Sequence, residues 1–368
     1  MRSLLALCGI GISAFWIHFN APYLAGAAFG GTVTKSVLLV VNQGDKNLSV
    51  VDPATERQIA TISQELTTVH GHEVAASPDG RFAYVPVYGS GVVGGPGIDG
   101  REMLVFDIRS RKISGKVDFG NGVRPHCVVY DPVSGLLYVT TELANSVTIV
   151  DPKSLKVVGT IPTTQPQSHM LAISHDGRRG YTANVKPGSV SVLDIAARKT
   201  TTVIPISPVT QRISISNDDS MVFTADQSKP QLAVIDTSTN TVKNWVPLPA
   251  SGYGTASTRD GRWLLVAIGG FAMTPSKMAT PPPQGGVAVV DLRTLQVTRT
   301  IPVPGAAQEV LMSPDGKVAY VSCMVHTTDA ASGKQIGQVA VIDLTEWKVQ
   351  SLIDVGVGAD GLAWANGS

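Results

Sequence analysis

Short apolar runs alternate with clusters of turn-forming residues from residue 36 almost to the end of the chain. Each unit contains an apolar run, a turn, a second apolar run, a polar break and a segment of the form V-x-V-x-D. The first two runs and their turn are seen in AASPDGRFAYVP, VVYDPVSGLLYVTT, AISHDGRRGYTAN, SISNDDSMVFTAD, ASTRDGRWLLVA and LMSPDGKVAYVS. Asp-Gly pairs suit hairpin turns that need a positive φ, and runs of this length between such turns predict β-strands.

The third strand of each unit ends on an aspartate, so the repeat can be measured from one aspartate to the next. These residues are Asp52, Asp107, Asp151, Asp194, Asp236, Asp291 and Asp343, at spacings of 42 to 55 residues. A unit of this length with four short strands is typical of a β-propeller blade. We therefore predict an all-β protein with one propeller domain over residues 28–368.

The two ends of the repeat complement each other. SVLLVVNQGDKNLSVVD and then RQIATI supply the second, third and fourth strands of a blade that lacks its first strand, and ADGLAWA supplies only a first strand. Pairing the strand near Leu362 with the strand near Leu38 gives seven blades and leaves no open sheet edge.

These features resemble the YVTN-repeat, or YncE-like, family of seven-bladed β-propellers, which is similar in fold to the seven-bladed lactonases. The resemblance lies in AYVPVYGS, LYVTTELANSVTIVD and GYTANVKPGSVSVLD and covers residues 36–366. It implies the fold and leaves the function open, because one fold can host many activities.

Three blades are longer than the others, and the additional residues lie between the second and third strands. The insertions read GSGVVGGPGIDGRE, GGFAMTPSKMATPPPQGG and MVHTTDAASGKQIG. In a four-stranded meander these loops emerge on the face where the chain enters each first strand. Long loops on one face of a scaffold commonly carry function, so we expect the site there.

One position on this face is rich in histidine. Aligned on the hairpin turn, the position five residues before Ser77 is occupied around the ring by His72, His126, His169, Arg212, Tyr253, Gln308 and Asp360. Six histidines follow residue 27, and three of them occupy this position in successive blades. Because first strands line the channel, three imidazoles should converge there. Three histidines with an open position form the ligand set of a catalytic zinc or a copper site. We predict that His72, His126 and His169 bind such an ion, although a polar lining of a water-filled channel is the alternative.

Three further residues are the predicted catalytic groups. Arg212 would bind an anionic or oxyanionic group of the substrate, and Tyr253 would donate a hydrogen bond. Glu309, next to Gln308, is a possible base.

Other candidates carry less specific signals. His70 could be a ligand or an ordinary loop residue, and Glu142 is a second possible base. Met273, Met278, Met324 and His326 lie in the inserted loops, where they favour either copper or a flexible lid. His175 belongs to the opposite face, and Cys127 should point away from His126 as a packed thiol.

Composition and the N-terminus limit the function classes. Arg2, the apolar stretch from Leu4 to Phe15 and small residues up to Ala27 predict a signal peptide over residues 1–27, with an uncleaved anchor as the alternative. The remainder has equal numbers of basic and acidic residues, which excludes the basic footprint of nucleic-acid binding. Motifs for covalent haem and for nucleotides are missing from the sequence. We expect a periplasmic or secreted monomer without stable membrane insertion.

Three functions remain open at this stage. The first is an enzyme that uses the three-histidine metal site on a small-molecule substrate, for which Arg212 suggests an anionic group. The second is a metal-free, lactonase-like hydrolase with a histidine base and Arg212 as oxyanion stabiliser. The third is a propeller that binds a ligand or a protein without catalysis.

Overall fold

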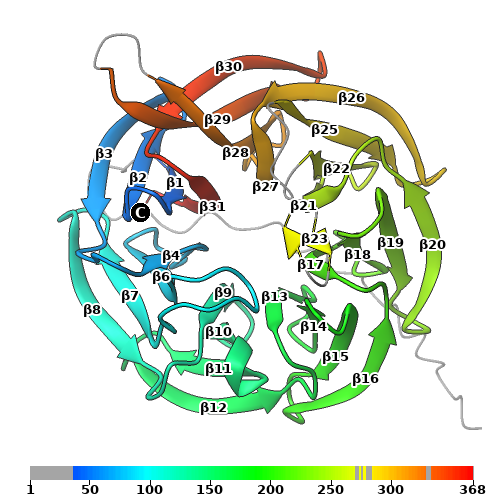
Figure 1. The fold of residues 1–368 in the computed structure, drawn as a ribbon, viewed down its shortest axis with the longest axis horizontal. Helices are drawn as coiled ribbons and strands as arrows, with labels where there is room; N and C mark the ends of the chain where they lie inside the picture. Colours follow the sequence, from blue (N-terminus) through cyan, green and yellow to red (C-terminus); the bar gives the residue numbers. More distant parts are fainter. Residues whose placement is uncertain (1–35, 270–272, 275–276, 279–283, 329–332, 368) are drawn as a thin grey trace, which may run out of the picture. The chain divides into compact units, whose positions relative to one another are not determined.

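The computed structural model describes residues 36–269, 273–274, 277–278, 284–328 and 333–367. The predicted signal peptide lies outside these residues. Seven blade sheets form a ring in the described part of the chain, with their first strands toward its centre (Figure 1), as the repeat predicts. No helix in the described ranges is both long and apolar enough to cross a bilayer.

The first blade joins the two ends of the repeat. Its strands, from the channel outward, are β31 (Ala359–Ala365), β1 (Val37–Asn42), β2 (Asn47–Asp52) and β3 (Arg57–Ser63). Leu38 pairs with Trp364, and Val40 pairs with Leu362. The predicted closure is therefore confirmed.

The second, third and fourth blades follow in chain order. The second has β4 (His70–Gly71), β5 (Ala75–Ala76), β6 (Phe82–Gly89), β7 (Glu102–Asp107) and β8 (Lys112–Asp118). The third has β9 (Pro125–Asp131), β10 (Leu136–Thr141), the 3-10 turn η1 (Glu142–Ala144), β11 (Ser146–Asp151) and β12 (Lys156–Pro162). The fourth has β13 (Ser168–Ile173), β14 (Arg179–Asn184), β15 (Ser189–Asp194) and β16 (Lys199–Pro205).

The last three blades complete the ring. The fifth has β17 (Thr210–Ile215), β18 (Met221–Asp226), β19 (Gln231–Asp236) and β20 (Thr241–Pro247). The sixth has β21 (Gly252–Ser257), β22 (Trp263–Ile268), β25 (Gln284–Asp291) and β26 (Gln296–Pro304), with the short pair β23 (Met273–Thr274) and β24 (Lys277–Met278) in its insertion. The seventh has β27 (Ala306–Met312), β28 (Val318–Thr328), β29 (Gln335–Asp343) and β30 (Lys348–Val355).

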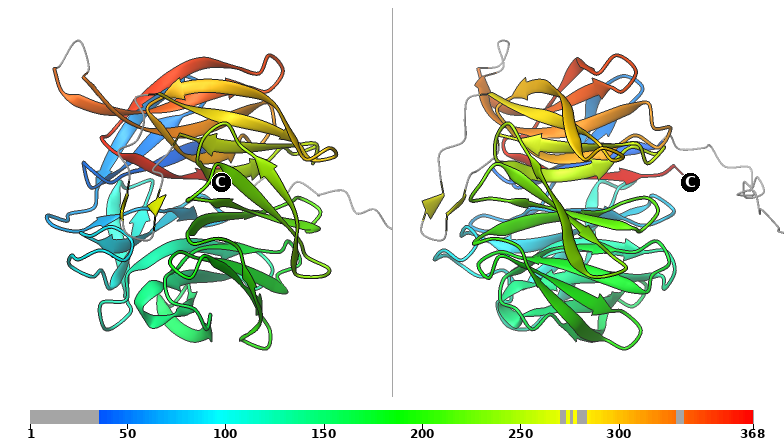
Figure 2. Two further views of the ribbon diagram at one scale, coloured as in Figure 1. Left: turned by 45° about the vertical axis from the view of Figure 1, so that its right-hand side comes forward. Right: turned by 90° about the vertical axis from the view of Figure 1, so that its right-hand side faces the viewer.

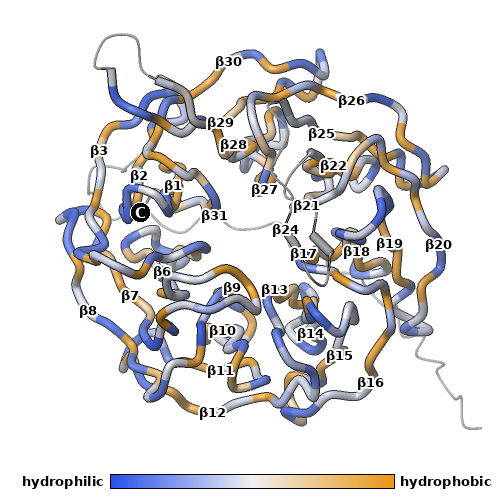
Figure 3. The backbone as a smooth tube through the Cα atoms, in the orientation of Figure 1, coloured by the Kyte–Doolittle hydropathy of each residue, from blue (hydrophilic) through white to orange (hydrophobic). Residues whose placement is uncertain are grey.

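The core lies between neighbouring blades, where apolar strand faces meet (Figure 3). One second-strand position supplies a large side chain in six blades. These residues are Tyr84, Tyr138, Tyr181, Phe223, Leu265 and Tyr320, each at most 3% exposed. Full burial of such a side chain stabilises the fold by roughly 1.5–3 kcal/mol, so this position contributes strongly to packing in most blades.

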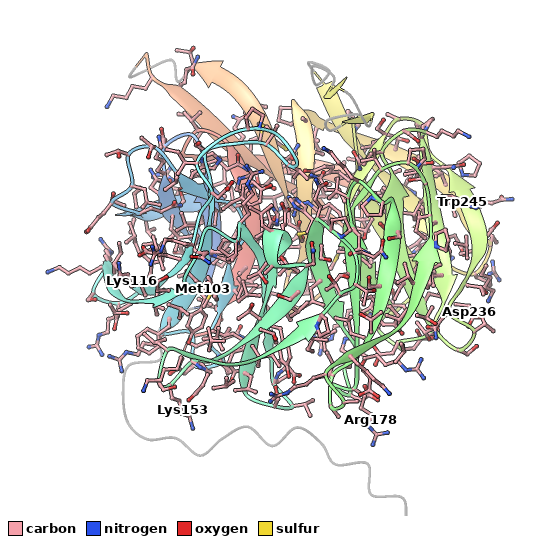
Figure 4. All side chains as sticks on the ribbon, turned by 60° about the horizontal axis from the view of Figure 1, so that its bottom comes forward. Met103, Lys116, Lys153, Arg178, Asp236 and Trp245 are labelled. Atoms are coloured by element: carbon pink, nitrogen blue, oxygen red, sulfur yellow. The ribbon has the colours of Figure 1, made fainter. Side chains whose placement is uncertain are left out.

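The hairpin turns between first and second strands lie at the far face of the propeller, opposite the face where the chain enters each first strand. They contain the Asp-Gly turns that the sequence predicts. In the second blade, Gly80 has a φ of +65° and Ser77 donates its hydroxyl hydrogen to Asp79. The fourth blade repeats this arrangement with Gly177, whose φ is +69°. The loop between β6 and β7 and the short strands β23 and β24 lie at the opposite face (Figure 2), while Lys153 and Arg178 extend from the turn face (Figure 4).

Candidate functional site

The seven equivalent channel residues lie at irregularities of the innermost strands. In six blades the pairing of first and second strands shifts register at this position, and in the second blade the first strand is interrupted between β4 and β5. A β-bulge redirects side chains locally and is frequent next to active sites. The bulges here direct consecutive residues of one strand into the same region.

Hydroxyl groups of the second strands hold these bulges. The Thr140 hydroxyl accepts a hydrogen bond from Cys127 N at 2.9 Å and donates to His169 O at 2.8 Å. Thr224 donates to Arg212 O at 2.6 Å. These contacts satisfy backbone groups that the irregular pairing would otherwise leave without partners.

The structure brings the three predicted histidines together. The ring centroids of His72 and His126 are 5.0 Å apart, and those of His126 and His169 are 3.5 Å apart. His70 stacks on His72 at 4.9 Å. His126 and His169 are almost completely buried, whereas the side chain of His72 is 16% exposed.

Carboxylates support two of these imidazoles. Nδ1 of His72 lies 3.3 Å from Asp360, and Nδ1 of His169 contacts Glu142. The second oxygen of Glu142 accepts a hydrogen bond from the hydroxyl of Tyr88 at 2.8 Å. In contrast, Nε2 of His72 and Nδ1 of His126 are buried without a hydrogen-bond partner among the described residues.

Burial keeps the imidazoles of His126, His169 and His70 neutral by lowering their pKa values. It lowers the pKa of His126 well below its usual value, and the neighbouring His169 and His72 lower it further. Burial also lowers the pKa of His169, although Glu142 opposes this shift. Burial, His72 and Lys46 lower the pKa of His70 to about 4. Neutral imidazoles offer a lone pair at neutral pH, which is the form that binds metal.

Arg212 forms the centre of a second cluster beside the histidines. Its Nη1 donates to Glu73 at 2.5 Å and to Glu309 at 2.8 Å, and its Nη2 donates to Asp360 at 2.8 Å. The guanidinium also lies over the ring of Tyr253, 4.8 Å from the centroid. Both terminal nitrogens of Arg212 thus bind the protein's own carboxylates in this structure.

Three carboxylates around one guanidinium have different proton affinities. Burial raises the pKa of Glu309 to about 7 and that of Glu73 well above its usual value, although Arg212 opposes both shifts. Burial also acts against ionisation of Asp360, but Arg212 and His72 lower its pKa to about 2. Asp360 is therefore the ionised partner of Arg212, and Glu309 can exchange a proton near neutrality.

The first inserted loop, residues 90–101 between β6 and β7, reaches across the mouth toward the fourth blade (Figure 1). Arg124, two residues before His126, donates to Asp99 at 2.5 Å and to Gly95 O at 2.9 Å. Lys186, in the turn after β14, donates to Gly94 O at 3.4 Å. This loop therefore contacts Arg124, the residue directly before β9, which carries His126.

Comparison with known proteins identifies the fold family. The family model described as "Lactonase, 7-bladed beta-propeller" matches residues 17–244. This chain belongs to that lactonase family of seven-bladed β-propellers.

Individual relatives of this lactonase-family member are distant. It is 23% identical to the YncE proteins of Salmonella typhi and of Salmonella typhimurium over 252 and 253 residues, which are 67% of this chain and 66% of those proteins. A solved structure of hydrazine synthase from Kuenenia stuttgartiensis matches with a TM-score of 0.52 and 21% identity, over 60% of this chain and 63% of that one. At this identity the structural match indicates the fold alone.

The metal prediction for this lactonase-family propeller has one geometric obstacle. Within the described residues, no group of three or more His, Cys, Asp or Glu side chains is arranged as a ligand set for a metal ion. The His126 and His169 planes are tilted by only 31°, so their ring faces oppose each other. The donor types, the neutral state and the unpartnered nitrogens nevertheless suit an ion such as zinc.

The remaining candidates are placed as follows. Cys127 is buried in the core beside Leu171, as predicted for a packed thiol, and burial raises its pKa to about 12. His175 is exposed at the far face, where its Nδ1 lies 2.6 Å from Asp219. Met324 lies on β28, paired with Ala306. The side chains of Met273, Met278 and His326 lie outside the described residues.

Sequence reasoning missed four residues of the site in this family member: Tyr88, Glu73, Gln211 and Arg124. Tyr88 ends the long strand β6, and Glu73 and Gln211 each neighbour a channel position. Strict alternation along a strand predicts that such neighbours point away from the channel. Only knowledge of the bulges would have placed Glu73 and Gln211 at the channel mouth.

Proposed function

We propose that the channel mouth is a small-molecule site in which His72, His126 and His169 bind a transition metal ion, zinc or copper, for hydrolytic or oxidative catalysis. The observation that carries this proposal is the pair of buried, unpartnered nitrogens, His72 Nε2 and His126 Nδ1. Buried polar atoms without partners are uncommon and call for a functional explanation. A bound cation would give both lone pairs a partner. As a protein exported after loss of residues 1–27, the chain would acquire the ion outside the cytoplasm.

The surroundings of the histidines support the same proposal. Histidine ligands commonly have a carboxylate on the ring nitrogen that does not bind the metal, and Asp360 and Glu142 occupy such positions here. Glu73, Glu309 and Asp360 also outnumber the one guanidinium that all three contact, that of Arg212. Burial raises the pKa values of Glu73 and Glu309, and repulsion from the Asp360 carboxylate raises them further. A metal ion would supply the missing positive charge.

Binding would require the His126 ring, which has no partner on Nδ1 among the described residues, to rotate away from its stack on His169, while Glu142 keeps His169 in place. The second torsion of a histidine side chain has a broad intrinsic energy profile, so the torsion itself adds little to the cost of this rotation. A ligand-induced change of this kind is common because catalytic contacts frequently tighten only in the complex.

The chain's own residues suggest how catalysis would proceed. When bound, the ion would polarise a carbonyl group or activate water or dioxygen. Glu309, whose side chain is 22% exposed and whose pKa is about 7, would accept and return a proton. Tyr253 would remain a hydrogen-bond donor, because burial raises its pKa to about 12. Arg212 would order the carboxylates, which is a different role from the anion binding expected from the sequence.

A metal-free, lactonase-like hydrolase is the second candidate. Membership of the lactonase family and the near-neutral pKa of Glu309 favour it. In that case Glu309 or a histidine would be the base without any ion. Activity of chelator-treated protein on lactones would distinguish this candidate from the metal-dependent one.

Zinc titration of the chelator-treated protein tests the metal proposal. We expect the wild type to bind one zinc ion, and His126→Ala to lose more affinity than the roughly 10–100-fold that loss of a supporting residue costs. Isothermal titration calorimetry measures both. His175→Ala is the control, because that histidine is exposed at the far face and should leave binding unchanged. Equal zinc binding by the wild type and His126→Ala would refute the site.

A further inference from the structure

Glu142 is a buried carboxylate with two partners from different blades. It is 1% exposed and lies in η1, directly after β10. One oxygen accepts the Tyr88 hydroxyl hydrogen at 2.8 Å, and the other contacts Nδ1 of His169. A buried carboxylate is costly unless its oxygens are hydrogen-bonded, and these two contacts satisfy one site on each oxygen.

The contacts of His169 assign its tautomer. An ionised carboxylate can only accept hydrogen bonds, so the proton of the neutral ring must be on Nδ1. The other nitrogen, Nε2, lies 3.3 Å from the amide nitrogen of Gln211, which can only donate. The contact with Glu142 therefore places the proton on Nδ1, and the orientation of the Gln211 amide is compatible with a lone pair on Nε2.

Tyr88 connects this carboxylate with all three histidines. The residue is completely buried. Its ring is edge-on to His72, His126 and His169, with centroid distances of 4.9, 5.3 and 6.1 Å. A rigid aromatic ring in this place, held at its hydroxyl by Glu142, limits the orientations that the three imidazoles can adopt.

We propose that Tyr88 and Glu142 are positioning residues for the histidine site. Glu142 fixes the proton of His169 on Nδ1, so that Nε2 presents a lone pair that a ligand can take over from Gln211, and Tyr88 holds Glu142 and the three rings in place. The claim that Glu142 holds the His169 proton on Nδ1 concerns the metal-free protein. The effect on metal affinity rests on the proposed function.

Nitrogen NMR of the metal-free protein tests the tautomer. Protein with ¹⁵N-labelled histidine is examined by long-range ¹H–¹⁵N correlation, with the His169 signals assigned by their loss in His169→Gln. We expect a protonated Nδ1 in the wild type and in Glu142→Gln, whose side-chain oxygen still accepts, and in Tyr88→Phe. In Glu142→Leu the acceptor is gone, and the proton should redistribute to Nε2. A wild-type proton on Nε2, or an unchanged tautomer in Glu142→Leu, would overturn the assignment.

Zinc affinity then tests the positioning role separately. Glu142→Leu and Tyr88→Phe should each weaken zinc binding by roughly 10–100-fold. Because Tyr88→Phe removes only one oxygen atom, it still tests the role if Glu142→Leu does not fold. Tyr138→Phe is the matched control, because this tyrosine is equally buried but its hydroxyl lies 3.4 Å from Ser134 instead. Full zinc affinity in Tyr88→Phe would contradict the role of Tyr88. If the wild type bound no zinc while the tautomer still shifted in Glu142→Leu, the metal proposal would fail and the role of Glu142 would stand.

Discussion

At the scale of single residues, the cluster around Arg212 shows why a buried cation does not by itself imply an anion-binding site. The sequence places Arg212 at a channel position, which suggests a group that recognises an anionic substrate. In the structure, Glu73, Glu309 and Asp360 occupy its terminal nitrogens. All three carboxylates come from blades distant in sequence from Arg212, so no local pattern reveals them. Arg212 is better described as the cation that allows several carboxylates to be buried together.

Glu309→Gln should change the pH dependence of stability. The folded-state pKa of Glu309 is about 7, above its usual 4.5. The folded protein therefore favours the protonated carboxyl, and the wild type loses stability as the pH rises from 4.5 toward 7 and this group must ionise. A glutamine stays neutral at every pH. We expect the free energy of unfolding of the variant, relative to wild type, to rise by on the order of 1–3 kcal/mol between pH 4 and pH 8.

Urea denaturation at several pH values measures this difference. Glu65→Gln, a change at an exposed glutamate, is the control and should show no comparable trend. A difference between Glu309→Gln and wild type that is constant with pH, or that falls as the pH rises, would contradict a raised pKa at this position.

At the scale of strands, the bulges separate what the sequence could predict from what it could not. The alignment placed His126 and its equivalents correctly because turn chemistry and strand length repeat from blade to blade. The opposite orientation predicted for Cys127 is also correct. Alternation fails for Glu73 and Glu309, which occupy the equivalent position to Cys127 but reach Arg212. A β-bulge cannot be recognised from the alternation of polar and apolar residues in the sequence. The contacts of Glu73 and Glu309 with Arg212 could therefore be seen only in the structure.

Thr140→Val should destabilise the histidine side of the channel. Valine has a similar shape but leaves the Cys127 N–H and the His169 carbonyl without their present partner. Each buried backbone group left unsatisfied costs about 1–3 kcal/mol. We expect a loss of roughly 2–4 kcal/mol in the free energy of unfolding from urea titrations. Thr241→Val, on the exposed outer strand β20, should change it by less than about 0.5 kcal/mol. An equally small effect for both variants would show that the hydroxyl does not support the bulges.

At the scale of the whole molecule, ring closure assembles the site. Asp360 comes from β31, the last strand, and contacts His72 in the second blade and Arg212 in the fifth. The sequence predicted the seven blades, the closure by Leu38 and Leu362, and the face of the inserted loops, since each depends on a repeated local pattern. It could not predict the contacts of the first loop with Arg124 and Lys186. Those contacts depend on how one blade's loop meets the next two blades in space.

X-ray absorption at the zinc edge of the loaded protein tests the central claim most directly. If His72, His126 and His169 share one ion, the spectrum should show three imidazole nitrogens at about 2.0–2.1 Å. The spectrum of His126→Ala should show fewer imidazoles, and that of His175→Ala should match the wild type. A shell of oxygen atoms without imidazole scattering, or an imidazole count that His126→Ala does not change, would contradict a metal site at the channel mouth.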